Sequence, residues 1–138
     1  MKMKKKHWEE KQIFVLIVAM FKVDVVVSIG MSAKEILRWT NRHAKEYIKE
    51  EIAEQIKEFD TDFQRDGQGR MIQTGGGFLV AIRPNPSWVK TFGTLVHEMT
   101  HVTQYLLKDR SIPLSQDTDE VHAYLVEYLV TSAARKML

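Results

Sequence analysis

The sequence of 138 residues contains no cysteine. This absence excludes disulfides, thiolate nucleophiles and every zinc site that uses a cysteine ligand. Any metal that the protein binds must therefore be held by histidine, aspartate or glutamate side chains. Proline and glycine are also scarce, at 3 and 7 residues, and hydrophobic residues make up 44% of the chain. This composition is typical of a globular protein, and the length predicts a single domain over residues 1–138.

The sequence also lacks an excess of one charge and a long apolar segment. Its 20 basic and 18 acidic residues leave a formal net charge of +2, so the basic face of a nucleic-acid-binding protein is not expected. The longest apolar run, Ile13 to Phe21, has nine residues, whereas a membrane-spanning helix needs about 20. Residues 1–11 are expected to form a flexible basic tail, in which Glu9 and Glu10 argue against a secretory signal. We therefore expect a cytoplasmic protein that binds neither nucleic acid nor membrane.

Three segments have the pattern of β-strands. Between residues 13 and 27 all odd positions are apolar, which predicts strand structure with those positions on one buried face, as one bent strand or two short ones. The segments 70–74 and 78–83 read as two strands of a hairpin, joined by Gly75, Gly76 and Gly77. A phosphate-binding loop is disfavoured there, because no Lys-Ser or Lys-Thr follows the glycines.

Three other segments have the pattern of helices. Ser32 and Glu35 form a capping box for an amphipathic helix that extends towards Phe59, with a break near Asn41 left open. Ser87 is the expected N-cap of a second helix, over residues 88–109, and a third spans about 118–136. The residues expected on the buried faces of these two helices are Val89, Phe92, Val96, Met99, Val102, Leu106 and Leu107, and Val121, Leu125, Tyr128 and Leu129. The order of elements predicts an α+β domain.

The second helix carries the sequence HExxH, formed by His97, Glu98 and His101. At 3.6 residues per turn, positions 97 and 101 are only ~40° apart, so both imidazoles can bind one zinc ion. Glu98 lies beside them, where its carboxylate can act as a general base on water. Gly93, one turn before His97, costs up to ~1 kcal/mol relative to alanine. Close approach of a strand or substrate and tight helix packing both remain open as explanations.

These residues resemble the core of a zincin metallopeptidase. The resemblance implies a small sheet on a backing helix, an active-site helix with HExxH, a C-terminal helix with a glutamate, and a last strand, 78–83, that borders the cleft. The metzincin pattern does not fit, because Gln104 and Leu107 replace its glycine and histidine. The gluzincin pattern does fit, and it implies Glu120, 19 positions after His101, as the third zinc ligand. The last 60 residues are also similar to small HExxH proteins of phage genomes.

The helical geometry of the last segment leaves alternatives for the third ligand. Glu120, Tyr124 and Glu127 share one face, whereas His122 lies ~200° from Glu120 and is the weakest candidate. Glu120 could instead close a capping box that begins at Asp117. On the basis of the gluzincin spacing, we predict that Glu120 binds the metal. Glu127 would contact one of the metal ligands without binding the metal itself. Tyr124 is our candidate for stabilising the oxyanion, with Tyr105 and His122 as alternatives.

The sequence therefore predicts a zinc-dependent peptidase. Its substrate would be an extended peptide or protein, bound as an added strand along 78–83, and its catalytic base would be Glu98. A zinc-binding phage structural or regulatory protein without catalysis is the second hypothesis, although such a site has no use for Glu98. A helix-rich nucleic-acid-binding module is the third, and the balanced charge disfavours it. The sequence does not indicate an oligomeric state.

Overall fold

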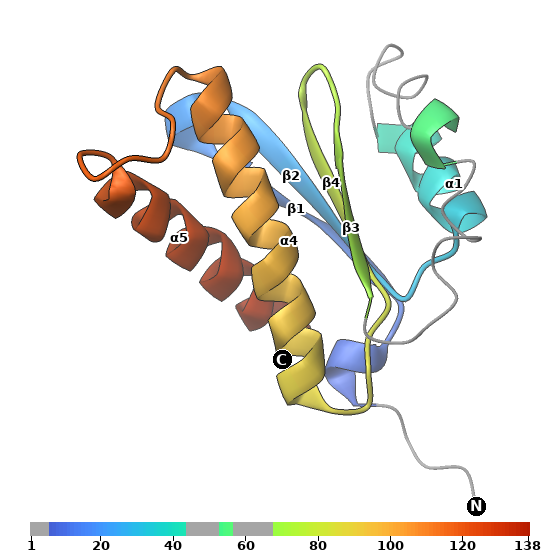
Figure 1. Ribbon diagram of the computed structural model, residues 1–138. Helices are drawn as coiled ribbons and strands as arrows, with labels where there is room; N and C mark the ends of the chain where they lie inside the picture. Colours follow the sequence, from blue (N-terminus) through green and yellow to red (C-terminus); the bar gives the residue numbers. More distant parts are fainter. Residues whose placement is uncertain (1–5, 44–52, 57–67) are drawn as a thin grey trace, which may run out of the picture.

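A four-stranded sheet forms the centre of the protein (Figure 1). The computed structural model describes residues 6–43, 53–56 and 68–138. The strands are β1 (Gln12–Val18), β2 (Val23–Ile29), β3 (Gly69–Gln73) and β4 (Gly77–Ile82), and their order in the sheet is β1-β2-β4-β3. β2 and β4 are parallel, while β1 pairs with β2 and β3 with β4 in antiparallel fashion. The expected α+β class is confirmed.

Helices cover both faces of this sheet. The helices α4 (Trp88–Asp109) and α5 (Asp119–Met137) lie side by side on one face, and α1 (Ala33–His43) lies on the other (Figure 1). The larger core cluster lies between the sheet and α4 and α5, and it includes Val25, Val27, Val80, Met99 and Leu129. The smaller cluster lies on the α1 side and consists of Ile36, Ile56, Ile72, Leu79 and Ala81. In the described part of the chain, no helix is long and apolar enough to span a membrane.

The segment 13–27 forms two strands, joined by a 3-10 turn, η2 (Ala19–Phe21), and Lys22 in the left-handed region. The pairs in the β1–β2 ladder, such as Leu16 with Val25, join an even residue to an odd one. Paired residues share a face, so the positions that face the larger core cluster are even in β1 and odd in β2. The expectation of one odd-numbered buried face is therefore wrong for β1, where Ile17 is 62% exposed. The turn changes the parity, which the alternation of the sequence does not show.

The second hairpin, β3–β4, lies within one residue of its expected bounds. Thr74 closes its turn, donating its backbone N–H to the carbonyl of Gly77 and accepting the Gly77 N–H on its hydroxyl. β4 is a central strand, paired with β2 on one side and with β3 on the other. The prediction that 78–83 offers a free edge to a peptide is therefore wrong, because both of its edges are already hydrogen-bonded. β3 is the edge strand at this end of the sheet.

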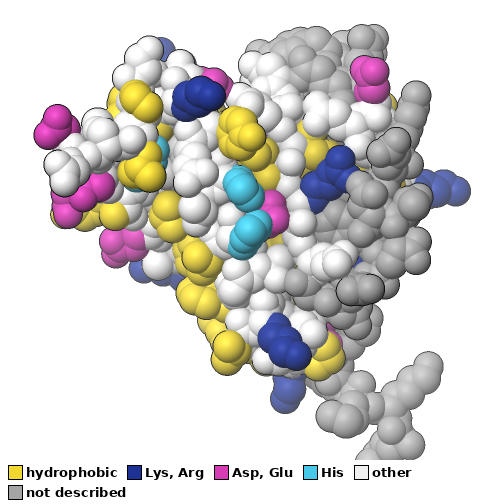
Figure 2. Space-filling model, viewed as in Figure 1, with side chains coloured by type: hydrophobic (Ala, Val, Ile, Leu, Met, Phe, Trp, Pro, Cys, Tyr) yellow, Lys and Arg dark blue, Asp and Glu magenta, His cyan; other side chains and the backbone are white. Residues whose placement is uncertain are grey.

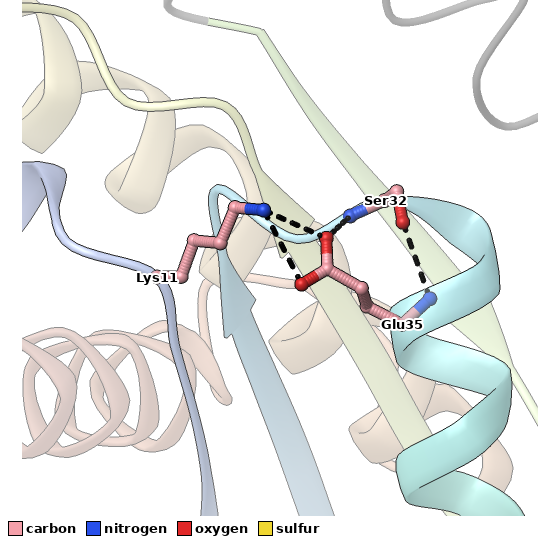
Figure 3. Close-up of polar contacts among 3 residues, drawn as sticks. All are labelled: Lys11, Ser32 and Glu35. Carbon is pink, nitrogen blue, oxygen red and sulfur yellow. Dashed lines mark hydrogen bonds and ion pairs between the residues drawn. The ribbon is translucent and has the colours of Figure 1, made fainter.

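The start of α1 confirms the predicted capping box (Figure 3). The Glu35 backbone N–H donates to the Ser32 hydroxyl at 3.2 Å, and the Ser32 N–H donates to the Glu35 carboxylate at 3.0 Å. Lys11 adds an ion pair to the same carboxylate. The hydrogen bond from Ser32 and, after it, the bond from Lys11 hold the pKa of Glu35 below its usual value. The described part of the predicted helix comprises α1 and the helical residues 53–56, and the rest, to Phe59, lies outside the described residues.

The two long helices have nearly the predicted bounds, and their predicted buried faces are confirmed in part: Met99, Val102, Leu106, Leu107, Leu125 and Leu129 are buried. On α4, Ser87 is the N-cap, and Leu95 is buried while Val89 and Phe92 are 78% and 38% exposed. The buried stripe of α4 is Thr91, Leu95, Glu98, Met99, Val102, Thr103, Leu106 and Leu107. On α5, Val121 and Tyr128 are exposed, and the buried residues are His122, Leu125, Leu129, Val130, Ala133 and Met137. The prediction is therefore wrong for Val89 and Phe92 on α4 and for Val121 and Tyr128 on α5.

Residues 6–11 of the expected flexible tail pack on the domain. The Nδ1 atom of His7 lies 2.6 Å from the carbonyl oxygen of Met137, at the end of α5. The Trp8 indole N–H donates to the carbonyl of Asn85, and its ring packs on that of Trp88 at the start of α4. This part of the segment is therefore tied to both long helices.

Candidate functional site

The middle of α4 brings the HExxH residues together at the surface. The Nε2 atoms of His97 and His101 lie 3.2 Å apart, and their rings meet edge to face with centroids 4.8 Å apart. Figure 2 shows two adjacent histidine side chains on this face of the molecule with an acidic side chain beside them. The helical spacing therefore places both imidazoles where the sequence predicts.

The distance between the Nε2 atoms of His97 and His101 can be compared with the spacing of two imidazole nitrogens bound to one zinc ion. Zinc binds imidazole nitrogen at about 2.0–2.1 Å, so an ion equidistant from both Nε2 atoms would see them at an angle of about 100°. This value is near the tetrahedral angle that zinc prefers in proteins. Neutral imidazoles are also the most common metal ligands among side chains. The 3.2 Å separation of the two Nε2 atoms is therefore compatible with both imidazoles binding one metal ion.

Glu98 lies next to the imidazoles and is buried, with 5% of its surface exposed. Burial raises the pKa of its carboxyl group, and the nearby His97 and His101 partly oppose this rise. A carboxylate whose pKa is raised towards neutrality is a better proton acceptor at the pH where many enzymes act. The raised pKa of Glu98 is compatible with the predicted role of this residue as a general base.

The structure does not bring Glu120 or Tyr124 to these three residues. Buried residues of α5 such as Leu129 define its core-facing side, and Glu120 lies about 180° from Leu129 around the helix. Glu120 and Glu127 are accordingly exposed. Tyr124 is 67% exposed and lines an apolar groove against η2. Among the described residues, no three His, Asp or Glu side chains could hold one metal ion. The role of Glu120 as a ligand remains a prediction from the gluzincin resemblance.

The remaining alternatives from the sequence are His122 and the Asp117 capping box at the start of α5, and Tyr105 on α4. His122 is buried, and its Nε2 atom lies 3.0 Å from the carbonyl oxygen of Ile112 in the preceding loop. The capping box from Asp117 is wrong, since the N-cap is Thr118 and no side-chain cap bond forms there. The Thr118 hydroxyl instead donates to the carbonyl of Pro113. Tyr105, the third oxyanion candidate, follows His101 by one turn of α4 and is 45% exposed.

Two glycines lie near the candidate site, Gly93 on α4 and Gly69 at the start of β3, and the space around them differs. Apart from its chain neighbours and its own helix backbone, a Cβ atom added to Gly93 would meet nothing described within 4 Å, so neither tight helix packing nor a described strand accounts for this glycine. Gly69, which the sequence analysis did not single out, lies directly against Glu98 and Thr94. The expected strand began at residue 70, so the sequence pattern did not place Gly69 within it; β3 begins at Gly69 in the structure.

No family model, no curated protein and no solved structure matches this chain.

Proposed function

We propose that the protein is a zinc-dependent peptidase of the zincin type. The observation that carries this proposal is the 3.2 Å separation of the His97 and His101 nitrogens beside the buried carboxylate of Glu98. His97 and His101 would hold the zinc ion. When bound, zinc would act as a Lewis acid and lower the pKa of water far below its usual value.

Glu98 would act first as the general base and then as the general acid of the reaction. Its carboxylate accepts a proton from the attacking water, whose oxygen forms the new bond to the peptide carbonyl carbon. Glu98 then returns this proton to the amide nitrogen as the carbon–nitrogen bond breaks, so that an amine leaves and a carboxylic acid forms. Burial of Glu98 favours this role, because it makes the carboxylate a stronger base than an exposed one.

Access of a peptide to this site would involve β3 instead of β4. β3 is the edge strand, and α4 packs against it. Its outer edge has no partner strand among the described residues. An extended peptide can add to such an edge through backbone hydrogen bonds, with its side chains alternating towards and away from the sheet.

The experiment that tests the proposal is the cleavage of a mixed library of quenched fluorescent peptides by the zinc-loaded protein. The variant Glu98→Gln should keep its zinc and lose cleavage by about 10²–10⁴-fold, the range typical of an acid–base group. The matched control is Glu54→Gln, which changes an exposed glutamate in the helical segment 53–56 and should cleave at the wild-type rate. Equal rates for the Glu98→Gln and wild-type proteins would contradict the proposed mechanism.

A further inference from the structure

The start of β3 is pressed against the side chain of Glu98. A Cβ atom built on Gly69 would lie 2.6 Å from Cγ of Glu98, 3.2 Å from its Cδ and 2.7 Å from Cγ2 of Thr94. Carbon atoms attract each other best at about 3.5–4.0 Å, so no side chain can occupy this position while Glu98 stays where it is. Thr94 lies one helical turn before Glu98 on the same side of α4, so both side chains meet the backbone of Gly69.

Space, and not backbone conformation, accounts for glycine at this position. Gly30 is the one glycine with a positive φ in the described part of the chain, so the backbone of Gly69 suits any residue. Gly69 pairs with Ile82 in the β3–β4 ladder, where glycine weakens a strand and other residues are favoured. The strand thus carries an unfavourable residue at the point where it touches Glu98.

Gly77 provides an instructive contrast. A Cβ atom on Gly77 would collide with the backbone carbonyl oxygen of Asp24 in β2, which pairs with it in the sheet. The neighbours of Gly69 are side-chain atoms, which can rotate, whereas the neighbour of Gly77 is backbone, which cannot move without disturbing the sheet. A larger residue at 69 would therefore displace Glu98, while a larger residue at 77 would destabilise the fold.

We propose that Gly69 is a positioning residue. Because it has no side chain, β3 packs directly against Glu98 and holds the carboxylate of Glu98 beside the proposed metal ligands His97 and His101. This inference rests on the proposed peptidase function for its catalytic consequence. Glu98 is buried where β3 meets α4, so this close packing restricts the direction of its side chain. Accurate placement matters, because a displacement of about 1 Å can cost roughly 10²-fold in rate.

The test is Gly69→Ala in the full chain, measured with the same quenched peptides and with zinc alone. We expect kcat to fall about 10²-fold, with KM and zinc affinity within about twofold of wild type, because the imidazoles are untouched. Gly77→Ala is the control: its melting temperature should fall, while kcat measured below that temperature should match wild type. Wild-type kcat in a folded, zinc-loaded Gly69→Ala protein would overturn the proposal.

A second variant covers the case in which Gly69→Ala does not fold. Gly69→Ala combined with Thr94→Ser removes the methyl group at 2.7 Å and leaves the contact with Glu98. The double variant should fold and still show reduced kcat, whereas recovery of the wild-type kcat would contradict the role of Glu98 crowding. If the wild-type protein cleaves no peptide, the peptidase proposal fails. The crystal structure of the variant still decides the positioning role: a rotated Glu98 supports it, and an unmoved Glu98 overturns it.

Discussion

The helices α4 and α5 pack side by side on the same face of the sheet (Figure 1), yet they present their polar residues in opposite ways. α4 buries the carboxylate of Glu98 and keeps the adjacent imidazoles at the surface. α5 buries the imidazole of His122 and exposes the carboxylates of Glu120 and Glu127. The buried Glu98 of α4 lies beside His97 and His101, which oppose the effect of burial on its pKa, whereas the buried imidazole of α5 contacts a backbone carbonyl. The difference supports the proposal that α4 carries the chemistry and that α5 has a structural role.

The largest effect that tests this comparison concerns the core, where the two helices are equivalent. Leu95 of α4 and Leu129 of α5 are both fully buried in the same cluster. Replacing either with alanine should lower the free energy of unfolding by about 2–5 kcal/mol, through lost burial and a residual cavity. Urea titration of both variants measures this. A loss below about 1 kcal/mol for Leu129→Ala, together with a full loss for Leu95→Ala, would show that α5 is not an integral part of the core.

The next effect concerns the buried imidazole of α5. His122→Ala removes the contact with the Ile112 carbonyl and should cost about 1–3 kcal/mol of stability, because the carbonyl is left without its partner. Zinc affinity should not change, since the His122 imidazole contacts the Ile112 carbonyl and forms no metal-ligand group with the α4 histidines. Calorimetric zinc titration of the folded variant gives this answer. Loss of zinc binding would show that α5 contributes to the metal site and would contradict its purely structural role.

The third prediction follows from the pKa of Glu98 and applies to the metal-free protein in chelator. The pKa of Glu98 is raised in the folded state, so its stabilising contribution is complete below the unfolded pKa and is lost as pH rises through the folded pKa. Glutamine mimics the protonated form. Glu98→Gln should therefore melt at a higher temperature than wild type near pH 8 and at the same temperature near pH 4.

The α5 control for this measurement is Glu127→Gln. Glu127 is exposed, and substitutions at such surface positions usually stay within about 0.5 kcal/mol. Its melting curves should therefore follow those of wild type at both pH values. A Glu98→Gln protein that melts below wild type near pH 8 would contradict the burial of an ionised Glu98.

The smallest expected effect concerns Glu120. With its side chain on the solvent side of α5, Glu120→Gln should change zinc affinity by less than about threefold, well below the 10–100-fold typical of residues that support a ligand. Competition with a fluorescent zinc chelator measures this. Near-complete loss of zinc would instead support the gluzincin pattern and would require α5 to rotate in the metal-bound protein.

The features that the sequence predicts well are those fixed by neighbours along the chain. The 97–101 spacing sets the two imidazoles on one face of any helix, the Ser32–Glu35 capping box needs only one turn, and the triglycine places the β3–β4 turn. In each case the residues that determine the geometry lie within four positions of one another. Element bounds were therefore accurate to one or two residues where the structure describes them.

The features that were missed depend on contacts between distant segments. The exposure of Ile17 follows from the register of β1 on β2, and the central place of β4 follows from its parallel pairing with β2. The side of α5 that faces the core is chosen by Leu129 and Ala133, and this choice carries Glu120 away from α4. The contact of Gly69 with Glu98 joins residues 29 positions apart. Local patterns contain no information on such pairings.

The central claim is that His97 and His101 form one metal site, and the zinc content of the purified protein tests it most directly. After equilibrium dialysis against zinc, the wild-type protein should hold one zinc ion per chain by elemental analysis. The variants His97→Ala and His101→Ala, folded by circular dichroism, should each hold less than about a tenth of this amount, because removing a ligand leaves a single imidazole. Full zinc content in either variant, or none in the wild-type protein, would contradict the account.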